Sequence, residues 1–300
     1  MSAQSEKLNK IKNLVLSGGG SKGFAYFGVY KALLEIKPDF LDQLNSITGT
    51  SAGAIVATLL ALKYTPDELY SFITSFDYEK LKSWDIMNIF INKGIETGKT
   101  LTVFLQKIVS KKFPNNPDPT FQDLYQLHPF TLNILVSHLN TYETIIYNHE
   151  KTPDFSITQA IRQSISIPII FTPTAVVSED KVNYYVDGGL INNFPIDIFP
   201  DSEETIGIIL DNSKQEFEIR NNEEYIYHVM MCGYHQMTLH KLKHYKKTQI
   251  MEIDTQEIHS AQFDIDFTSR KNLHDIGYQA TLKYFTDVAD PPVVDSDESS

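Results

Sequence analysis

Apolar and polar residues alternate along the first third of the chain in two units of the same design. Each unit has a short apolar run typical of a buried parallel strand, then a turn rich in glycine, then a stretch with helical periodicity. The strands, turns and helices fall at 13–17, 18–20 and 22–36, and again at 46–48, 49–53 and 54–64. Strand, glycine turn and helix twice in succession predict a parallel α/β sheet whose loops gather at the carboxyl ends of its strands.

Beyond these units the pattern predicts further helices and strands. Thr65-Pro66-Asp67-Glu68 is a capping box with proline at the first helical position, and it opens a helix that ends near Phe76. Other helices are predicted at 98–112, 120–126, 156–164, 223–242 and 272–285, and strands at 129–137, 143–147, near 175 and 184, at 205–210 and at 249–253.

No clean linker and no internal repeat beyond the two glycine turns divide these elements. We therefore predict a single domain over 13–288, in which 210–288 is a mainly helical C-terminal part. An N-terminal extension over 1–12 precedes it. The segment 289–300 carries two prolines and several acids, so a disordered acidic tail is expected there.

Composition and charge narrow the class of protein. Hydrophobic residues make up 42% of the chain and aromatic residues 12%, which is enough for a buried core. The formal net charge of −12 argues against a nucleic-acid-binding protein, which needs a basic face for phosphates. Cys232 is the single cysteine, which excludes an intramolecular disulfide and gives no cysteine cluster for structural zinc.

No targeting or membrane-spanning segment is predicted. The polar start over 1–12 has no apolar core of a signal peptide. The stretch 43–62 is free of charge, but its first half is polar and contains glycine, so it fits strand, turn and helix better than a membrane span. Together with the lone cysteine, this predicts a cytoplasmic protein.

The most informative motif is Gly49-Thr50-Ser51-Ala52-Gly53. Between a strand and a helix, Gly-x-Ser-x-Gly forms a tight strained turn that exposes the serine as a nucleophile. Chance would supply the pattern in a chain of this length roughly one time in ten, so its strand-turn-helix context carries much of the weight. The competing interpretation is a serine helix cap beside packing glycines.

Two further motifs supply what acyl transfer needs besides a nucleophile. Gly18-Gly19-Gly20-Ser21-Lys22-Gly23 follows a strand and offers backbone N–H groups for an oxyanion. Its glycines also match a dinucleotide fingerprint, and Lys22 fits either a lipid phosphate or a surface helix start. Asp187, before Gly188-Gly189 at the end of an apolar strand, is a candidate base, although aspartate before glycine is ordinarily a turn residue.

In this combination and order the motifs resemble the patatin-like phospholipase family. Two more matches are the segment from Ala160 to Phe171, close to the family's A-x-x-S-x-S-x-P-x-x-F and containing Arg162, and Asn193-Phe194-Pro195. The matches cover about residues 13–210, and no motif position departs from the family's pattern. The resemblance implies a three-layer α/β/α fold with a mostly parallel central sheet.

The resemblance also implies a Ser51–Asp187 dyad without a catalytic histidine. Asp187 would take the proton of Ser51, the amides of the Gly18–Gly20 loop and of Ala52 would hold the oxyanion, and Gly49, Gly53, Gly23 and Gly189 would support the turns. The implied activity is hydrolysis of phospholipid or glycerolipid esters at a membrane surface, with no metal or cofactor. A Ser-His-Asp triad is the competing mechanism, and its histidine candidates are His235, His240, His259 and His274.

Two alternatives for the function use the same core: an effector that a protein partner activates, and an acyltransferase. The sequence leaves the oligomeric state open. For membrane contact, the run from Lys241 to Lys247 combines lysines with apolar residues, but it equally fits a solvated helix end. The apolar stretch from Trp84 to Ile95 fits a lid over the pocket or, more ordinarily, core packing.

Overall fold

The structure is a computed structural model that describes residues 7–75, 88–211, 218–219, 222–255 and 265–286. Its main sheet contains β1 (Asn13–Leu16), β2 (Ser46–Thr50), β4 (Thr131–His138), β5 (Glu143–Tyr147), β7 (Thr174–Ser178), β8 (Lys181–Asp187), β9 (Thr205–Asp211) and β10 (Gln249–Asp254). The strand order is β10-β9-β1-β2-β4-β8-β7, with β5 also paired to β4. The first five strands of this order are parallel, and β5, β7 and β8 pair antiparallel.

A second, two-stranded sheet consists of β3 (Gly94–Glu96) and β6 (Ile169–Phe171). The sequence pattern predicted neither strand. Each has only three residues, which is too short for an alternation of apolar and polar positions to show.

Helices connect and cover the strands. They are η1 (Gly20–Phe24), α2 (Ala25–Ile36), η2 (Phe40–Gln43), α3 (Ala52–Ala61), α4 (Pro66–Ser75), α5 (Asn88–Asn92), α6 (Lys99–Lys111), α7 (Phe121–Leu127), α8 (Ile157–Ser164), α9 (Gly189–Asn192), η4 (Pro195–Ile198), α10 (Asn222–His244) and α11 (Phe267–Thr286). The predicted capping box at Thr65 is present, because Thr65 and Glu68 each accept the other's backbone N–H.

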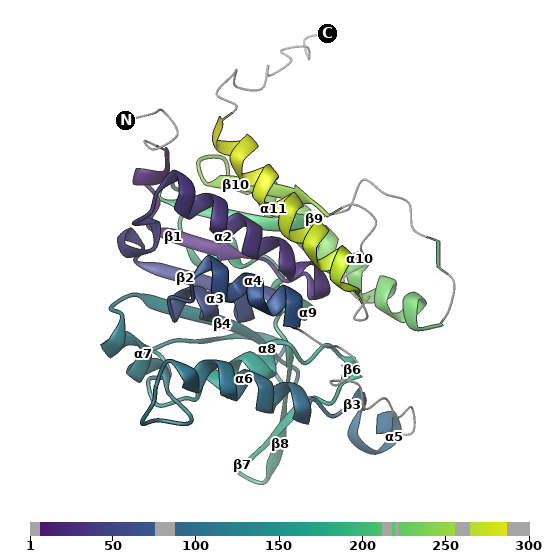
Figure 1. Ribbon diagram of the computed structural model, residues 1–300. Helices are drawn as coiled ribbons and strands as arrows, with labels where there is room; N and C mark the ends of the chain where they lie inside the picture. The colour runs from purple at the N-terminus through teal and green to yellow at the C-terminus, as the bar shows by residue number, and fades with distance from the viewer. Residues whose placement is uncertain (1–6, 76–87, 212–217, 220–221, 256–264, 287–300) are drawn as a thin grey trace.

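Alternate residues of the central strands feed two separate cores. On β1, Leu14 and Leu16 belong to the larger core, which α2, α3 and α11 help to form. Val15 points to the other face, where it packs with Phe194 and Ile196 of the loop and turn after α9. Helix α10 covers that second face. The molecule therefore has three layers, α/β/α, around a mostly parallel sheet, as the sequence predicted (Figure 1).

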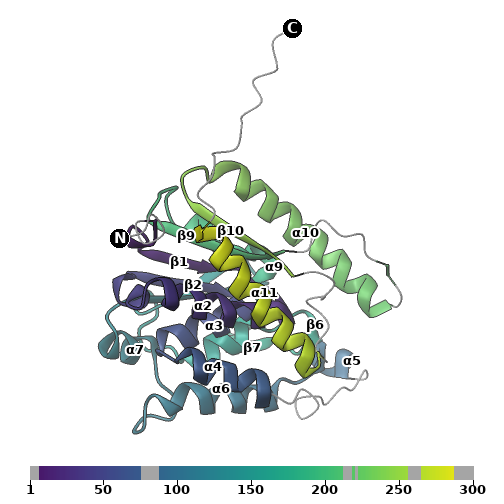
Figure 2. The same cartoon turned by 45° about the horizontal axis from the view of Figure 1, so that its top comes forward.

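The C-terminal part of the chain completes these layers. β10 extends the sheet beside β9, and α11 runs across α2 at close range in both views (Figures 1 and 2). The close approach requires glycine on both helices. A Cβ on Gly28 would lie 1.8 Å from the carbonyl oxygen of His274, and a Cβ on Gly277 would lie 2.0 Å from that of Ala25.

The N-terminal residues differ from the prediction of an extension over 1–12. Leu8 and Ile11 are fully buried in the larger core, so the fold begins before Asn13. The predicted tail at 289–300 lies outside the described residues. Among the helices that the structure describes, none is long and apolar enough to cross a membrane.

Candidate active site

The pairing of β4 explains how Ser51 and Asp187 come together. β2 pairs with β4 up to Thr50, which lies opposite Leu135. β8 pairs with the next part of β4 and ends at Asp187, opposite Val136. Because β5 occupies the other edge of β4 over both parts, β2 and β8 share one edge and meet end to end. The two strand ends thus bring Ser51 and Asp187 to one point.

Ser51 occupies a strained turn between β2 and α3. Its φ of 54° is positive, which is unfavourable for a residue with a side chain and is typical of a nucleophile elbow. The neighbouring glycines allow the turn, because the first residues of α3 lie directly on β1 and β2. A Cβ on Gly53 would lie 2.5 Å from the carbonyl oxygen of Leu16, and one on Gly49 would lie 2.2 Å from that of Gly53.

The Ser51 hydroxyl donates to Asp187 with an Oγ–Oδ2 distance of 2.6 Å. Both residues are buried, with exposed fractions of 6% and 2%. The other carboxylate oxygen of Asp187 accepts the backbone N–H of Gly189 at 2.7 Å. Burial raises the pKa of Asp187 to about 7, because desolvation outweighs these two hydrogen bonds. The carboxyl group is therefore a much stronger base than an ordinary aspartate.

The end of α8 holds both residues in place. Ser164 Oγ accepts the backbone N–H of Ser51 and donates to the carbonyl of Leu135 on β4. The carbonyl of Ser166 accepts the backbone N–H of Asp187. Both serines belong to the segment that resembles the family's A-x-x-S-x-S-x-P-x-x-F pattern, which did not predict their contacts with the dyad. The two serines are far from Ser51 in the sequence and come close to the dyad only in the folded chain. Their spacing alone therefore could not predict these contacts.

The glycine loop lies against Ser51, as a Cβ on Gly18 would stand 3.2 Å from that of Ser51. The Gly18 amide donates to the carbonyl of Asn193, so it is already used within the protein. This removes Gly18 from the predicted donors. Within the described chain, no protein acceptor is found for the amides of Gly19, Gly20 and Ala52. The last two residues border the same cavity as Ser51.

The position of Lys22 in the structure contradicts both of the roles that the sequence suggested for it. It is 3% exposed, so it is neither a surface residue at a helix start nor available to a lipid phosphate. Its Nζ donates to the carbonyl of Leu210, the penultimate residue of β9. Gly23 lets η1 approach α3, since a Cβ there would lie 3.1 Å from that of Ala52. Lys22 and Gly23 therefore fasten the glycine loop to its surroundings.

Arg162 ties together the chain segments on one side of the site. It is 7% exposed, and its guanidinium donates to the carbonyls of Thr97 and Thr172 at 2.9 and 3.0 Å, and to Ser166 Oγ. Gly98 has a φ of +72°, and a Cβ there would collide with the guanidinium. Arg162 thus fixes the loops after β3 and β6, two elements that the sequence pattern did not predict.

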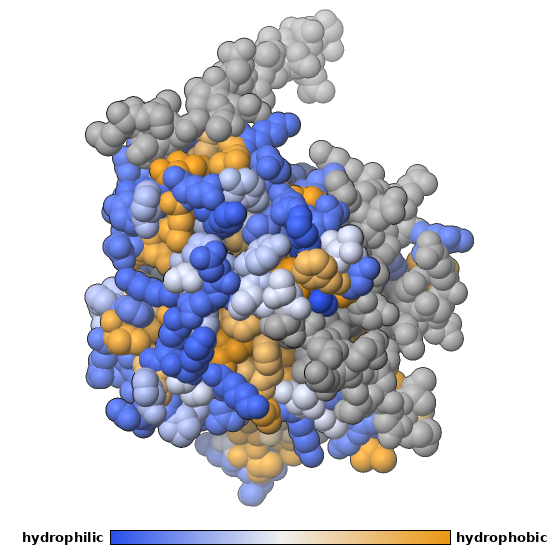
Figure 3. All heavy atoms as spheres, in the orientation of Figure 1, coloured by the Kyte–Doolittle hydropathy of each residue, from blue (hydrophilic) through white to orange (hydrophobic). Residues whose placement is uncertain are grey.

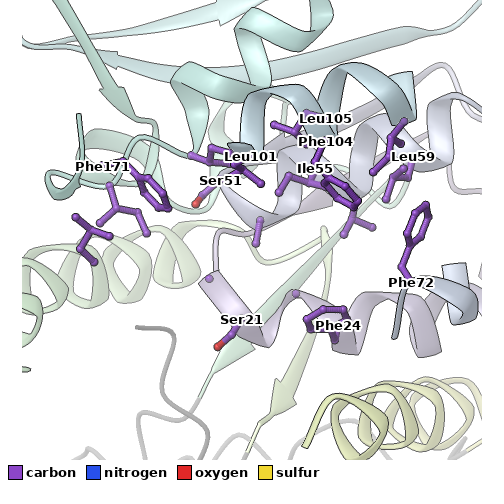
Figure 4. A pocket seen from close by; sticks show the side chains of 18 of the residues that line it. Ser21, Phe24, Ser51, Ile55, Leu59, Phe72, Leu101, Phe104, Leu105 and Phe171 are labelled. Carbon is purple, nitrogen blue, oxygen red and sulfur yellow. The ribbon is translucent and has the colours of Figure 1, made fainter. Parts of the chain in front are cut away.

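Ser51 opens into an apolar cavity (Figure 4). The cavity has an empty volume of about 1200 Å³, its opening to solvent included. Ile55 and Leu59 of α3 and Phe104 of α6 lie along it, from Ser51 to Phe72. The buried carboxylate of Glu96 is the one ionisable group among the lining residues, and it accepts the backbone N–H of Gly98.

The structure gives no support to a histidine base. His274 is buried on α11 against Tyr70, and His235 and His240 lie on α10. His259 lies outside the described residues. In the described chain, Ser51 Oγ donates to Asp187, and neither residue has a histidine as a hydrogen-bond partner.

Two segments remain to be compared with their predictions: the basic run, predicted to contact a membrane or to be a solvated helix end, and the apolar stretch, predicted to be a lid or core packing. In the basic run, Lys241 Nζ turns inward to Asn192, Phe194 and Asp197, and Leu242 and Tyr245 pack on the second core. Only Lys243, Lys246 and Lys247 of its lysines are exposed. Of the stretch from Trp84 to Ile95, the first four residues lie outside the described residues. Phe90 and Ile91 are exposed rather than packed in the core.

The sequence is similar to a known family and to individual proteins over most of its length. A sequence profile described as patatin-like phospholipase matches residues 14–200. The uncharacterized protein R571 of Acanthamoeba polyphaga mimivirus is 30% identical over 288 residues, which cover 91% of this chain and 93% of that protein. The probable lipid hydrolase 463L of Invertebrate iridescent virus 6 is 32% identical over 193 residues, 62% of either chain.

A solved structure shares the fold. VipD from Legionella pneumophila superposes with a TM-score of 0.62 and 20% sequence identity, over 92% of this chain and 67% of that one. At this identity the likeness concerns the fold alone. It extends over the C-terminal part of the chain, where the sequence motifs end.

Proposed function

Since the chain belongs to the patatin-like phospholipase family, and is thus a lipid hydrolase, we propose that it cleaves fatty acyl esters of phospholipids or other glycerolipids with Ser51 as nucleophile and Asp187 as base. The observation that supports this most directly is the 2.6 Å hydrogen bond to a buried carboxylate from the Oγ of Ser51, which lies at the wall of an apolar cavity. A serine alone is a weak nucleophile, and a base within hydrogen-bond reach is what activates it.

In the acylation step, Ser51 Oγ forms a bond to the ester carbonyl carbon while its proton passes to the Asp187 carboxylate. The oxyanion that develops on the carbonyl oxygen would accept hydrogen bonds from the amides of Gly19, Gly20 and Ala52. Each such donor contributes roughly 3–4 kcal/mol to transition-state stabilisation. Collapse of the tetrahedral intermediate breaks the bond to the leaving alkoxide. The alkoxide takes from Asp187 the proton that came from Ser51.

In the second step, water replaces the alcohol. Asp187 takes a proton from the water as its oxygen attacks the acyl-Ser51 carbonyl, and the proton then returns to Ser51 when the fatty acid leaves. The raised pKa of Asp187 suits both directions of transfer, because a base with a pKa near 7 accepts and releases a proton at neutral pH. The apolar cavity would hold the acyl chain throughout.

The test is hydrolysis of a panel of phospholipids and neutral glycerolipids by the wild type, Ser51→Ala and Asp187→Asn. We expect the wild type to release fatty acid and each variant to lose at least about a thousandfold in rate, because removing one member of a catalytic unit removes most of its effect. Product partitioning toward an added alcohol measures the acyltransferase alternative in the same assay.

Matched controls are Ser110→Ala and Asp42→Asn, which make the same chemical changes away from the cavity; the Asp42 carboxylate is 65% exposed. Both should retain wild-type rates. A Ser51→Ala enzyme with more than a tenth of wild-type activity would rule out Ser51 as the nucleophile. If changing any histidine to alanine lowers the hydrolysis rate as much as Ser51→Ala does, the dyad without a histidine is ruled out.

A further inference from the structure

One end of the molecule carries large apolar side chains that are open to solvent. Phe90 and Ile91 of α5 are 82% and 73% exposed, and Val177 and Val182 of the β7–β8 hairpin are 73% and 41% exposed. We refer to these four residues as the tip patch. In Figure 3 apolar atoms lie in two groups along the lower part of the molecule, at the places of the hairpin and of α5. Large apolar residues with such exposure at one end of a molecule mark an interaction surface rather than ordinary exposed side chains.

Strand geometry places the two valines of the patch on one face of the hairpin. Val177 and Val182 are directly paired across β7 and β8. Since side chains alternate along a strand, Tyr184 shares the face of Val182. The ammonium of Lys93, two residues after Ile91, lies 5.1 Å from the centroid of the Tyr184 ring. The side chain of the residue that follows α5 therefore reaches the face of the hairpin that carries the paired valines.

Both elements of the patch lead directly into the cavity wall. Lys93 is followed by β3, whose Glu96 lines the cavity. The hairpin strand β7 begins three residues after Phe171, which also lines the cavity together with Ile170. β8 ends at Asp187, and at about 3.3 Å per residue Val182 lies roughly 17 Å along the strand from it. Both elements of the patch are thus joined by short stretches of chain to the site that would hold the acyl chain.

We propose that the tip patch docks the protein on a phospholipid surface and inserts Phe90, Ile91 and Val177 among the acyl chains; this rests on the proposed function. An ester in a bilayer must move from the bilayer into the cavity, and a docking surface whose two elements are joined by short chain segments to the cavity wall would bring that wall close to the bilayer. Aromatic and aliphatic side chains enter an interface readily, to a depth of about 5–10 Å.

The charges around the patch fit this occupant. Exposed Lys93 and Lys181 flank it and would lie at the level of the headgroup phosphates. Exposed Glu179 and Asp180 form the turn of the hairpin, so a strongly anionic surface is not required. Vesicles of phosphatidylcholine with about one fifth phosphatidylserine are therefore the appropriate probe.

The experiment is flotation of the full chain with these vesicles, in a Ser51→Ala background so that binding is measured without turnover. The variants are Phe90→Glu with Ile91→Glu, and Val177→Glu alone. The matched control is Leu127→Glu, a 46% exposed leucine on α7 at the opposite side of the molecule in Figures 1 and 2. We expect at least tenfold weaker partitioning for the patch variants and less than a twofold change for the control.

With Ser51 intact, the same variants should lose hydrolysis of vesicle lipid in proportion to binding, while hydrolysis of a water-soluble short-chain ester stays at the wild-type rate. That unchanged rate and a wild-type thermal transition also show that the variants fold. Vesicle binding by the patch variants equal to wild type, or no vesicle binding by wild type, overturns the docking surface. A wild-type dimer that the patch variants dissociate in sedimentation velocity makes it a self-association surface instead. An enzyme inert on every ester defeats the proposed function and leaves the flotation result standing by itself.

Discussion

The carboxyl group of Asp187 is buried beneath Ser51, and desolvation raises its pKa from 3.8 to about 7. Only the ionised form can accept the proton of Ser51. We therefore expect kcat/KM for a soluble ester to rise with pH and level off above a midpoint near 7. A profile measured from about pH 5 to pH 9 tests this, and equal rates at both ends would show that another group is the base.

The same shift predicts a change in folding stability with pH. Between pH 3.8 and about 7 the folded state keeps a proton on Asp187 that the unfolded state releases, so this contribution is full below pH 3.8 and is lost as pH rises to about 7. A shift of this size corresponds to about 4 kcal/mol. Asp187→Asn should therefore gain stability over wild type at pH 8 but not at pH 4, as urea unfolding can measure. A constant difference would show that the carboxyl ionises freely in the folded protein.

At the residue scale, motifs predicted Ser51 and Asp187 because the chemistry restricts both the residue types and their turns. They failed for Lys22, for which the sequence offered a lipid phosphate or a surface position at a helix start, whereas the side chain is buried. The buried carbonyl of Leu210 that it bonds comes from a strand 188 residues further along the chain. No local pattern contains such a partner, and the same holds for Asn193, which uses the amide of Gly18.

At the scale of single elements, the end of α8 connects the dyad to the cavity wall through Arg162. Arg162→Lys keeps the charge but loses the planar fork that reaches the carbonyls of Thr97 and Thr172. We expect a loss of about 2–3 kcal/mol in unfolding free energy, because two partly buried carbonyls lose their donor. Loosening of this wall should also raise KM for long-chain esters more than for short-chain esters, with little change in kcat.

Arg270→Lys is the control for this substitution. Arg270 is also 7% exposed and donates to two backbone carbonyls, those of Ile73 and Ile265. Ile73 follows Phe72 at the end of the cavity away from Ser51, whereas the partners of Arg162 directly follow Glu96 and Phe171 of the cavity wall. Its variant should lose similar stability in chemical denaturation without any change in the ratio of KM values. If both variants alter that ratio equally, Arg162 has a structural role alone.

Elements with a local signal were predicted well. Thr120 and Asp123 form a capping box at α7, and the predicted helix there is shifted by only one residue at either end. β3 and β6 were missed because each is held by the other and by Arg162, not by its own sequence. The single-residue preferences of three residues are too weak to define a strand.

At the scale of the whole molecule, α11 and β10 belong to the same layers as the motif-bearing part. The contact of α2 with α11 depends on Gly28, where a Cβ would lie 1.8 Å from the His274 carbonyl oxygen. Gly28→Ala should cost at least about 3 kcal/mol of unfolding free energy, because two backbones must move apart. Denaturant unfolding of the full chain measures it.

Gly233→Ala is the counterpart on α10, where a Cβ would meet nothing within 4 Å. Alanine there should stabilise the helix by up to about 1 kcal/mol. Equal stability of Gly28→Ala and wild type would show that α11 does not pack on α2 in solution. The sequence could not predict this contact, because a glycine within a helix gives no indication of which other helix packs against it.

Because β2 and β8 meet end to end on one edge of β4, β4 fixes the distance between the two reacting side chains. Ser51 and Asp187 are separated by 136 residues of chain, yet consecutive positions of one strand set their distance. Loops between them can change in length without altering it. A slip of one residue in either pairing would move a reacting group by about 3.3 Å and turn its side chain to the other face. Ester turnover during refolding would therefore count only those molecules in which both strands have found their register.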